Sequence, residues 1–380
     1  MMKQSDVIPV VYIVTKLELG GAQKVCLSLF NGLSQQGQCS FLISGNQGPL
    51  VSQVAQNPHA ILLARMQAEL SLKGLWNEIK TLTALIKQLK TLKKEYPHLI
   101  VHTHSTKAGI MGRWAAWCAG IKKRVHTVHG FGFHAHQSRI AWLLIFLSEW
   151  LTSFITTHYV CVSQADIAIG IRLLPFFSNN HSLIRAAVDW PQFYRPAQRT
   201  KLVDDTQFIF GTVSCFKKQK NLFDLLNAFA FIHQQIPHAK LEVIGDGSLR
   251  PDIEAWINNH NLKESITLHG WQEQVAPFMM TWHAFVLSSL WEGLPCAVVE
   301  ARLLQLPVIS YNTGGINEVI TNQENGLLYP PGNWQKLAEG MLSLCTDKNL
   351  YKKFYLHQDN LASFNGQVMI DQHIKLYRQI

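Results

Sequence analysis

Short apolar segments alternate with longer amphipathic segments along the whole chain, and this alternation constrains the fold more than any other feature. The first series has apolar segments at 7–15, 39–44 and 98–105, with a helix-like segment at 20–37. A second series begins at 208–216 and continues at 240–246, 265–270, 283–289 and 307–311. Alternation of this kind predicts parallel strands joined by helices. Because the series starts twice, we expect an α/β protein with two doubly wound, Rossmann-like domains.

The best candidate for a linker is the segment 182–207, where two prolines and a run of polar residues interrupt the pattern. We therefore predict a first domain at 1–198 and a second at 199–360, and we expect the last helix, about 360–380, to pack back on the first domain. Ligands of doubly wound sheets bind at the carboxyl ends of the strands. Two such domains facing each other would enclose a cleft, and we expect the substrates there.

The cysteine pattern indicates a reducing compartment. The chain of 380 residues has seven cysteines, with no CxxC pair and no Cys/His spacing typical of a zinc site. The apolar segment near the start is followed by no cleavage site of a signal peptide, so we interpret it as the first strand. These observations favour reduced, buried thiols in a cytoplasmic protein.

The positive charge is confined to the first half of the chain. Residues 1–200 contain 20 Lys and Arg against 8 Asp and Glu, a net +12, and residues 201–380 contain 14 against 17, a net −3, which together give the total of +9. A basic domain favours phosphorylated ligands or anionic lipid head groups. No nucleic-acid-binding motif accompanies the charge, so we expect no nucleic-acid partner.

The longest apolar stretch, 140–157, is too short and too interrupted by polar residues to predict a membrane-spanning helix. We expect most of this helix to be buried in the first domain. We also expect part of the basic face, with residues 122–124, to contact an anionic membrane surface, with Trp142 and Trp150 at the interface.

The segment 284–310 carries the most informative motif. Glu292 follows an apolar strand, and Glu300 comes after seven intervening residues, about two turns into a helix that begins near Pro295. Ionised carboxylates accept hydrogen bonds from sugar and ribose hydroxyls, and a helix amino end can hold phosphate. Two arbitrary glutamates are usually solvated surface residues, but this strand-loop-helix context favours a nucleotide-sugar site.

With this motif, the chain resembles glycosyltransferase family 4, retaining enzymes of the two-domain GT-B fold whose signature is a Glu, seven residues and a second Glu. The resemblance extends over nearly the whole chain. It implies that Glu292 lies beside the donor sugar and Glu300 beside the nucleotide ribose, with Gly293 and Leu294 among the donor-binding residues.

The segment 211–229 resembles the part of the family that binds the donor diphosphate. Lys220 falls on the position of the family's lysine, and its ammonium would offset charge on the leaving diphosphate. Cys215 stands where many members have arginine, so a bidentate phosphate contact is missing, and Lys217 or Lys218 would have to replace it.

Two paired glycines also match the family. Gly20 and Gly21 stand in what looks like its glycine-rich first loop, and Gly314 and Gly315 follow the strand at 307–311. Glycine allows the backbone to approach a phosphate closely, so all four are predicted to bind the donor. The first loop is not a GxGxxG motif, which argues against a dinucleotide cofactor.

The segment 102–134 holds five histidines. The resemblance implies that His129 reaches the donor sugar near the reacting carbon. His102 and His104 could form a metal pair, but no carboxylate or cysteine lies at ligand spacing, so we predict no metal. We expect His126, His134 and His136 to be structural or to lie on the acceptor side.

The resemblance implies a hexosyltransferase that needs no cofactor and retains the anomeric configuration. His129, Lys220 and Glu292 would be catalytic, the donor would be a nucleotide sugar, UDP-linked by family frequency, and the acceptor lipid-linked or a glycan. We expect it to build O-antigen, capsule or exopolysaccharide on the inner face of a bacterial membrane. The alternatives are a nucleotide-sugar 2-epimerase of the same fold and an inactive scaffold that binds sugar or lipid.

Overall fold

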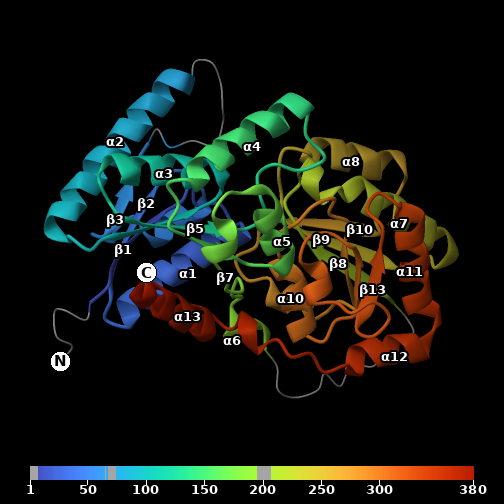
Figure 1. Ribbon diagram of the computed structural model, residues 1–380. Helices are drawn as coiled ribbons and strands as arrows, with labels where there is room; N and C mark the ends of the chain where they lie inside the picture. Colours follow the sequence, from blue (N-terminus) through green and yellow to red (C-terminus); the bar gives the residue numbers. More distant parts are fainter. Residues whose placement is uncertain (1–6, 65, 67–73, 195–206) are drawn as a thin grey trace. The chain divides into compact units, whose positions relative to one another are not determined.

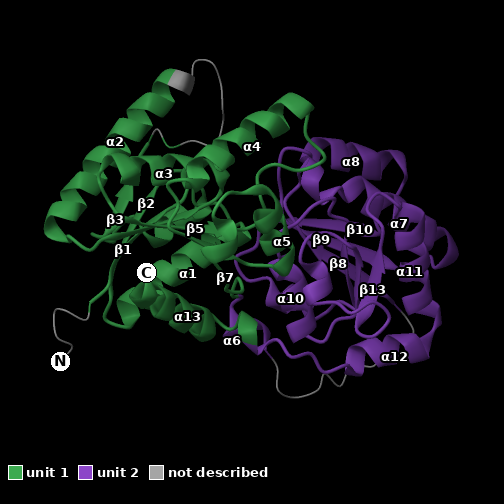
Figure 2. Cartoon of the chain, in the orientation of Figure 1, with its two compact units in different colours: residues 1–187, 363–380 green, residues 188–362 purple. Residues whose placement is uncertain are grey.

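The computed structural model describes residues 7–64, 66, 74–194 and 207–380, which form two compact units (Figure 1). Residues 1–187 and 363–380 form the first unit, and residues 188–362 form the second (Figure 2). The predicted boundary between residues 198 and 199 lies outside the described residues. The last helix, α13 (Gly366–Gln379), belongs to the first unit.

The first unit contains a sheet of seven described strands in the order β3-β2-β1-β4-β5-β6-β7, and each neighbouring pair is parallel. The strands are β1 (Pro9–Ile13), β2 (Cys39–Ser44), β3 (Ala60–Leu62), β4 (Ile100–His104), β5 (Lys123–Val128), β6 (His158–Cys161) and β7 (His181–Leu183). Apart from β7 this is the Rossmann order, in which the direction of strand addition reverses between β1 and β4. Ligands of such sheets bind at the carboxyl side of that reversal.

Helices cover both faces of this sheet. They are α1 (Gly21–Gln35), α2 (Gly74–Glu95), α3 (Thr106–Cys118), α4 (Arg139–Ser153), α5 (Gln164–Leu173) and α13. Val11 and Ile13 of β1 face α2 and α3 in one core, whereas Tyr12 points to the other face, where its hydroxyl lies 3.1 Å from that of Tyr377 on α13. Figure 1 shows α2 and α3 on one side of the sheet and α1 and α13 on the other. The helix α13 is thus part of the core of the first unit.

The second unit repeats the same topology, with six described parallel strands in the order β10-β9-β8-β11-β12-β13. The strands are β8 (Ile209–Val213), β9 (Lys240–Ile244), β10 (Ile266–Gly270), β11 (Ala284–Leu287), β12 (Val308–Tyr311) and β13 (Gly326–Tyr329). The reversal falls between β8 and β11. Its carboxyl side is therefore where a ligand is expected.

The helices of the second unit are α6 (Trp190–Phe193), α7 (Leu222–Gln235), α8 (Arg250–Asn259), α9 (Ala276–Met279), α10 (Cys296–Leu303), α11 (Trp334–Thr346) and α12 (Lys348–Leu356). Among them, α7 and α11 each bury one apolar face, whereas α10 is buried over most of its length. In α7, Leu225, Phe229 and Ile232 recur at helical spacing and are fully buried, and they share a core with Leu337 and Met341 of α11.

The helix α4 contradicts the expectation that the apolar stretch at 140–157 is mostly buried. Only Glu149, Thr152 and Ser153 of α4 are buried, whereas Ile140 is 75% exposed and Leu144 is 61% exposed. The expectation was wrong because periodicity marks the apolar face of a helix without showing which face meets the protein. Here the polar face turns inward.

The described cysteines are all free thiols. Cys26 and Cys161 are buried, and burial raises the pKa of both thiols well above the usual value. The expectation of burial is wrong for Cys118, which is exposed at the end of α3, and it holds only in part for the other four, which are partly buried: Cys39, Cys215, Cys296 and Cys345.

Candidate active site

The predicted site residues of the second unit follow the strands next to its topological reversal. Lys220 follows β8, Glu292 follows β11, and Gly314 follows β12. Parallel strands end at the same edge of a sheet, so the fold itself brings these loops together.

A direct ion pair joins two of the predicted catalytic residues. The Nζ atom of Lys220 lies 2.5 Å from Oε1 of Glu292, and the two side chains are only 19% and 8% exposed. The hydroxyl of Ser288 donates to the carbonyl oxygen of Lys220 at 2.9 Å and fixes its backbone. The ion pair is therefore largely shielded from solvent.

Backbone contacts hold the Lys220 loop against the Glu292 loop. The backbone N–H of Leu290 donates to the carbonyl oxygen of Gln219 at 2.8 Å, and the side-chain amide of Gln219 donates to the carbonyl oxygen of Trp291 at 2.8 Å. Asn221 adopts a left-handed conformation with φ of 45° between the short 3₁₀ helix at Lys218–Lys220 and α7. Asparagine tolerates this conformation better than most residues. Gln219 and Ser288 were not predicted from the sequence, because no short-range signal marks them.

Gly314 and Gly315, which follow β12, pack against the backbone of the Glu292 loop. The N–H of Gly315 donates to the carbonyl oxygen of Gly293 at 2.6 Å. Gly314 has φ of 55°, and a Cβ atom there would lie 2.1 Å from the carbonyl oxygen of Glu292. Glycine is therefore needed at 314 for the contact with the Glu292 backbone, whatever contact it makes with a ligand.

Glu300 lies closer to the start of its helix than the sequence analysis predicted. The helix α10 begins at Cys296 after Pro295, so Glu300 is its fifth residue, a little more than one turn from the start instead of two. Leu294 and Glu300 are each 8% exposed. The sequence estimate was too large, because the five positions from Pro295 to Glu300 make about one and a half turns of helix.

In the first unit, Gly20 and Gly21 form the amino end of α1 after β1. Gly20 has φ of −90°, so its conformation does not itself require glycine. The Cβ of a larger residue at 20 would meet the side-chain oxygen of Gln23 at 2.5 Å, which is the movable end of a side chain. A structural reason for this glycine is thus weaker than for Gly314.

His129 follows β5 and contacts a second histidine. Its Nε2 atom lies 3.0 Å from Nδ1 of His104, the last residue of β4. Burial, together with the neighbouring His373, lowers the pKa of His129 to about 4. At neutral pH the imidazole is uncharged, so it can donate or accept a hydrogen bond but cannot serve as a cation.

Other histidines form a buried network behind this pair. His102 Nδ1 lies 2.5 Å from the hydroxyl of Tyr377, and its Nε2 lies 2.6 Å from that of Thr127. Burial lowers the pKa of His102, His104 and His126 well below the usual range. No group of three or more potential metal ligands occurs among the described residues. His102 and His104 are thus hydrogen-bonded core residues, and the contact of His104 with His129 was not predicted from the sequence.

Comparison with known proteins identifies the family. Residues 19–189 match the family described as Glycosyltransferase Family 4, and residues 195–356 match the one described as Glycosyl transferases group 1. The chain is 31% identical over 341 residues to the Escherichia coli UDP-Gal:alpha-D-GlcNAc-diphosphoundecaprenol alpha-1,3-galactosyltransferase, and the match covers 87% of the chain and 86% of that relative. The chain belongs to glycosyltransferase family 4.

Further similarities agree with a glycosyltransferase. The Staphylococcus aureus capsular polysaccharide biosynthesis glycosyltransferase CapM is 25% identical over 285 residues, 71% of this chain and 73% of CapM. The crystal structure of Anabaena HepE in complex with UDP and glucose has a TM-score of 0.79 and 17% identity, and covers 98% of this chain and 100% of HepE. The predicted fold, with two Rossmann-like domains of the GT-B type, is confirmed.

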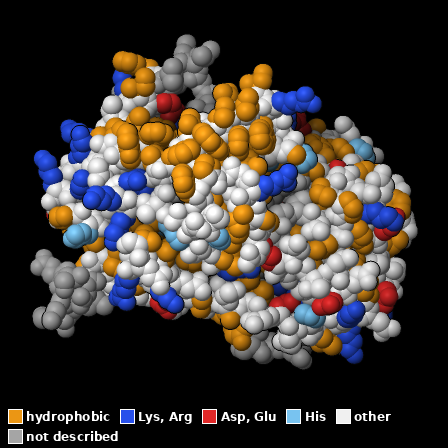
Figure 3. Space-filling view, viewed as in Figure 1, with side chains coloured by type: hydrophobic (Ala, Val, Ile, Leu, Met, Phe, Trp, Pro, Cys, Tyr) orange, Lys and Arg blue, Asp and Glu red, His pale blue; other side chains and the backbone are white. Residues whose placement is uncertain are grey.

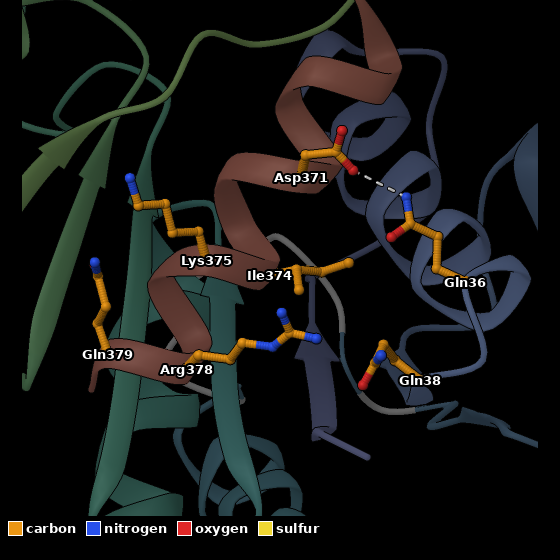
Figure 4. A pocket seen from close by; sticks show the side chains of 7 residues that line it. All are labelled: Gln36, Gln38, Asp371, Ile374, Lys375, Arg378 and Gln379. Atoms are coloured by element: carbon orange, nitrogen blue, oxygen red, sulfur yellow. Dashed lines mark hydrogen bonds between the residues drawn. The ribbon is translucent and has the colours of Figure 1, made fainter. Parts of the chain in front are cut away.

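A cavity of about 360 Å³ in this glycosyltransferase lies away from the predicted site residues (Figure 4). It is lined by Gln36, Gln38, Asp371, Ile374, Lys375, Arg378 and Gln379. Gln36 and Gln38 precede β2, so the cavity is at the amino ends of the strands, whereas the glycosyltransferase residues discussed above follow the carboxyl ends. None of the predicted site residues lines this cavity.

None of the helices in the described part of this glycosyltransferase combines the length and apolar character needed to cross a membrane.

Proposed function

We propose that this glycosyltransferase moves a hexose from a UDP-linked donor to a lipid-linked acceptor, with retention of anomeric configuration, in the synthesis of bacterial cell-surface polysaccharide. The observation that carries the proposal is the shielded Lys220–Glu292 pair at the carboxyl side of the β8–β11 reversal. The similar Escherichia coli protein is named for a UDP-sugar donor and a diphosphoundecaprenol acceptor, and CapM for capsular polysaccharide.

The second domain is proposed to bind the donor. The Lys220 ammonium offsets the negative charge that develops on the departing diphosphate, and the Glu292 carboxylate accepts hydrogen bonds from the donor sugar. Each charge neutralises the other, which avoids the cost of an unpaired charge in a shielded site. In the complex, the donor diphosphate replaces Glu292 as the partner of Lys220, and the sugar hydroxyls replace Lys220 as the partners of Glu292.

The surrounding loops of the second domain make the remaining contacts with the donor. Glu300 accepts hydrogen bonds from the ribose, and the backbone at Gly293, Leu294, Gly314 and Gly315 approaches the sugar and diphosphate. The hydrogen bond from Gly315 to Gly293 supports this grouping, because it holds the two loops together.

His129, Gly20 and Gly21 are the proposed contribution of the first domain. The uncharged His129 imidazole hydrogen-bonds a hydroxyl of the donor sugar and orients the ring. Gly20 and Gly21 present the amino end of α1 to phosphate. The proton of the acceptor hydroxyl passes to the departing phosphate oxygen, so transfer with retention needs neither a second carboxylate nor a metal ion.

The first domain is also proposed to bind the acceptor at the inner face of the cytoplasmic membrane. Its sequence carries the excess of positive charge, +12 over residues 1–200 from 20 basic and 8 acidic residues, which suits a lipid diphosphate and anionic head groups. Peripheral association with that membrane follows from the acceptor, since a polyprenyl chain stays in the bilayer.

The test is a transfer assay with a panel of UDP-sugars and a lipid diphosphate acceptor, with the anomeric configuration of the product determined by NMR. We expect a new α-linked glycolipid from an α-linked donor. A β-linked product would overturn retention, and no transfer with any UDP-sugar would overturn the choice of donor. Conversion of the donor without an acceptor would instead identify a nucleotide-sugar 2-epimerase.

A further inference from the structure

An apolar patch covers the outer face of α4. Its members are exposed side chains of α4, of Phe154 at its end and of Phe176 in the loop after α5: Ile140, Leu143, Leu144, Leu147, Trp150, Leu151, Phe154 and Phe176. The Phe154 and Phe176 rings are in edge contact at 5.6 Å between centroids, which joins the later residues to the helix. Figure 3 shows hydrophobic side chains gathered over α4, with Lys and Arg side chains on either side. We call this surface the α4 patch.

Contacts on the inner face of α4 fix the orientation that exposes the patch. Arg113 of α3 makes a bidentate ion pair with Glu149, at 2.8 Å to Oε1 and 2.9 Å to Oε2, and the two side chains are 0% and 4% exposed. The indole N–H of Trp114 donates to the Thr152 hydroxyl at 3.0 Å. Rotating the helix to bury its leucines would break these contacts. The fold therefore holds the apolar side of α4 outward.

A surface helix of a globular protein normally shows the opposite arrangement, with its polar residues facing the solvent. Apolar side chains in water are unfavourable, so an apolar surface of this kind indicates a binding partner. The helix has 15 residues and is thus roughly 22 Å long, less than the thickness of the hydrocarbon core of a bilayer. It can lie in the membrane surface but cannot cross it.

The charge around the patch favours an anionic bilayer over a second copy of the chain. Residues 105–180 contain seven Lys and Arg but only two acidic residues, Glu149 and Asp166, and both of these are 3% exposed. Lys122 lies beside the end of α4, because its carbonyl oxygen accepts a hydrogen bond from the Thr157 hydroxyl at 2.9 Å, and Arg139 begins the helix. Two such surfaces repel each other, whereas anionic head groups attract both ends of the helix.

We propose that the α4 patch inserts into the interfacial region of an anionic membrane, with α4 parallel to the bilayer plane. Trp150 would lie at the level of the head groups, where indole rings are favoured, and Lys122 and Arg139 would contact the lipid phosphates. The inference rests on the proposed function in one respect: the lipid-linked acceptor is the reason why this enzyme would bind a membrane.

The test is co-sedimentation of the full chain with vesicles of phosphatidylcholine alone and of phosphatidylcholine mixed with phosphatidylglycerol, without donor or acceptor. We expect binding to the mixed vesicles that weakens with salt. The double substitution L144E/L147E should lower the partition coefficient at least ~10-fold, because charges then replace inserted apolar groups. Substituting Lys122 and Arg139 by serine should reduce binding to the mixed vesicles and leave binding to the phosphatidylcholine vesicles unchanged.

The matched control is F231E/L356E, which adds two charges at apolar residues of the second unit that are 42% and 39% exposed. This variant should bind vesicles as the unchanged chain does. Equal loss in the control, or no binding by the unchanged chain, would overturn the inference. So would a dimer in analytical ultracentrifugation that L144E/L147E converts to a monomer. Transfer to a detergent-solubilised acceptor tests the proposed function separately, and L144E/L147E should retain it.

Discussion

The Nζ atom of Lys220 lies 2.5 Å from Oε1 of Glu292, although 72 positions separate the two residues in the sequence. Their loops follow β8 and β11, neighbours in the sheet, and hydrogen bonds through Gln219 hold the loops together. The pair is thus a consequence of the sheet topology and of a local backbone contact.

Replacing either member of this pair should remove transfer while leaving the protein folded. We expect Glu292→Gln and Lys220→Ala each to lower kcat/KM by at least ~100-fold, the typical effect of losing one electrostatic contact to a transition state. The matched control is Lys336→Ala, which breaks an exposed ion pair with Glu339 in the same unit. Near-normal transfer by Glu292→Gln or Lys220→Ala in the UDP-sugar assay would reject the assigned roles.

Replacing Gly314 should lower the stability of the protein more than replacing a glycine in an open turn. In Gly314→Ala, the new Cβ meets the Glu292 carbonyl oxygen, so we expect a loss of ~1–3 kcal/mol from overpacking in addition to ~1–2 kcal/mol from the left-handed backbone. Gly332 has φ of 79°, and a Cβ added there would meet nothing within 4 Å, so Gly332→Ala carries the backbone cost alone. Urea unfolding of both variants measures the difference. Equal losses would contradict the proposed contact.

The Arg113–Glu149 pair should contribute strongly to the stability of the first unit. Removing one partner leaves a buried charge without compensation, so we expect Arg113→Ala and Glu149→Ala each to lower the free energy of unfolding by ~3–5 kcal/mol. The double substitution R113M/E149L removes both charges and should recover most of the loss. If the double variant is as unstable as the single ones, the loss arises from packing and not from the unpaired charge.

The sequence predicted what depends on periodicity and on residues close together in the chain. Two parallel sheets follow from the repeated alternation, and the Glu292 and Glu300 motif lies within one strand-loop-helix segment. The inward turn of Glu149 could not be predicted, because its partner Arg113 is 36 positions away on another helix. The contact of Gly314 with the Glu292 carbonyl oxygen was missed for the same reason. It depends on the spatial approach of two loops that periodicity does not describe.

The hydrogen bond between His104 and His129 suggests that His104 positions the proposed catalytic imidazole. Its Nε2 atom is buried and has no hydrogen-bond partner among the described residues, so its hydrogen bond is made through Nδ1 to His129, and the ring also stacks on His102 at 4.6 Å between centroids. We expect His104→Phe to lower kcat roughly 5-fold, the worth of about one hydrogen bond, with little change in the KM of the donor. His104→Asn, which keeps a hydrogen-bonding group, should recover part of the rate. A larger effect on KM than on kcat would contradict a positioning role.

The buried histidines should make the first unit sensitive to acid. The pKa of His129 and of His373 is lowered from 6.5 to about 4, chiefly by burial. Above the usual pKa both folded and unfolded chains carry neutral imidazoles, so these groups do not change stability there. As the pH falls from 6.5 toward 4, the unfolded chain binds protons that the folded chain does not. Each such histidine then lowers the free energy of unfolding by ~1.4 kcal/mol per pH unit.

Urea unfolding at a series of pH values, followed by circular dichroism, measures this slope. The substitution His373→Phe removes one of the titrating groups, so its stability should fall by ~1.4 kcal/mol less per pH unit across the same range. His260 is exposed on the second unit, where its ring stacks on Trp256 at 3.8 Å between centroids, and His260→Phe is the control for replacing a histidine outside the buried network. A common slope for all three proteins would show that His373 is protonated equally in the folded and unfolded states, in which case burial does not hold it neutral.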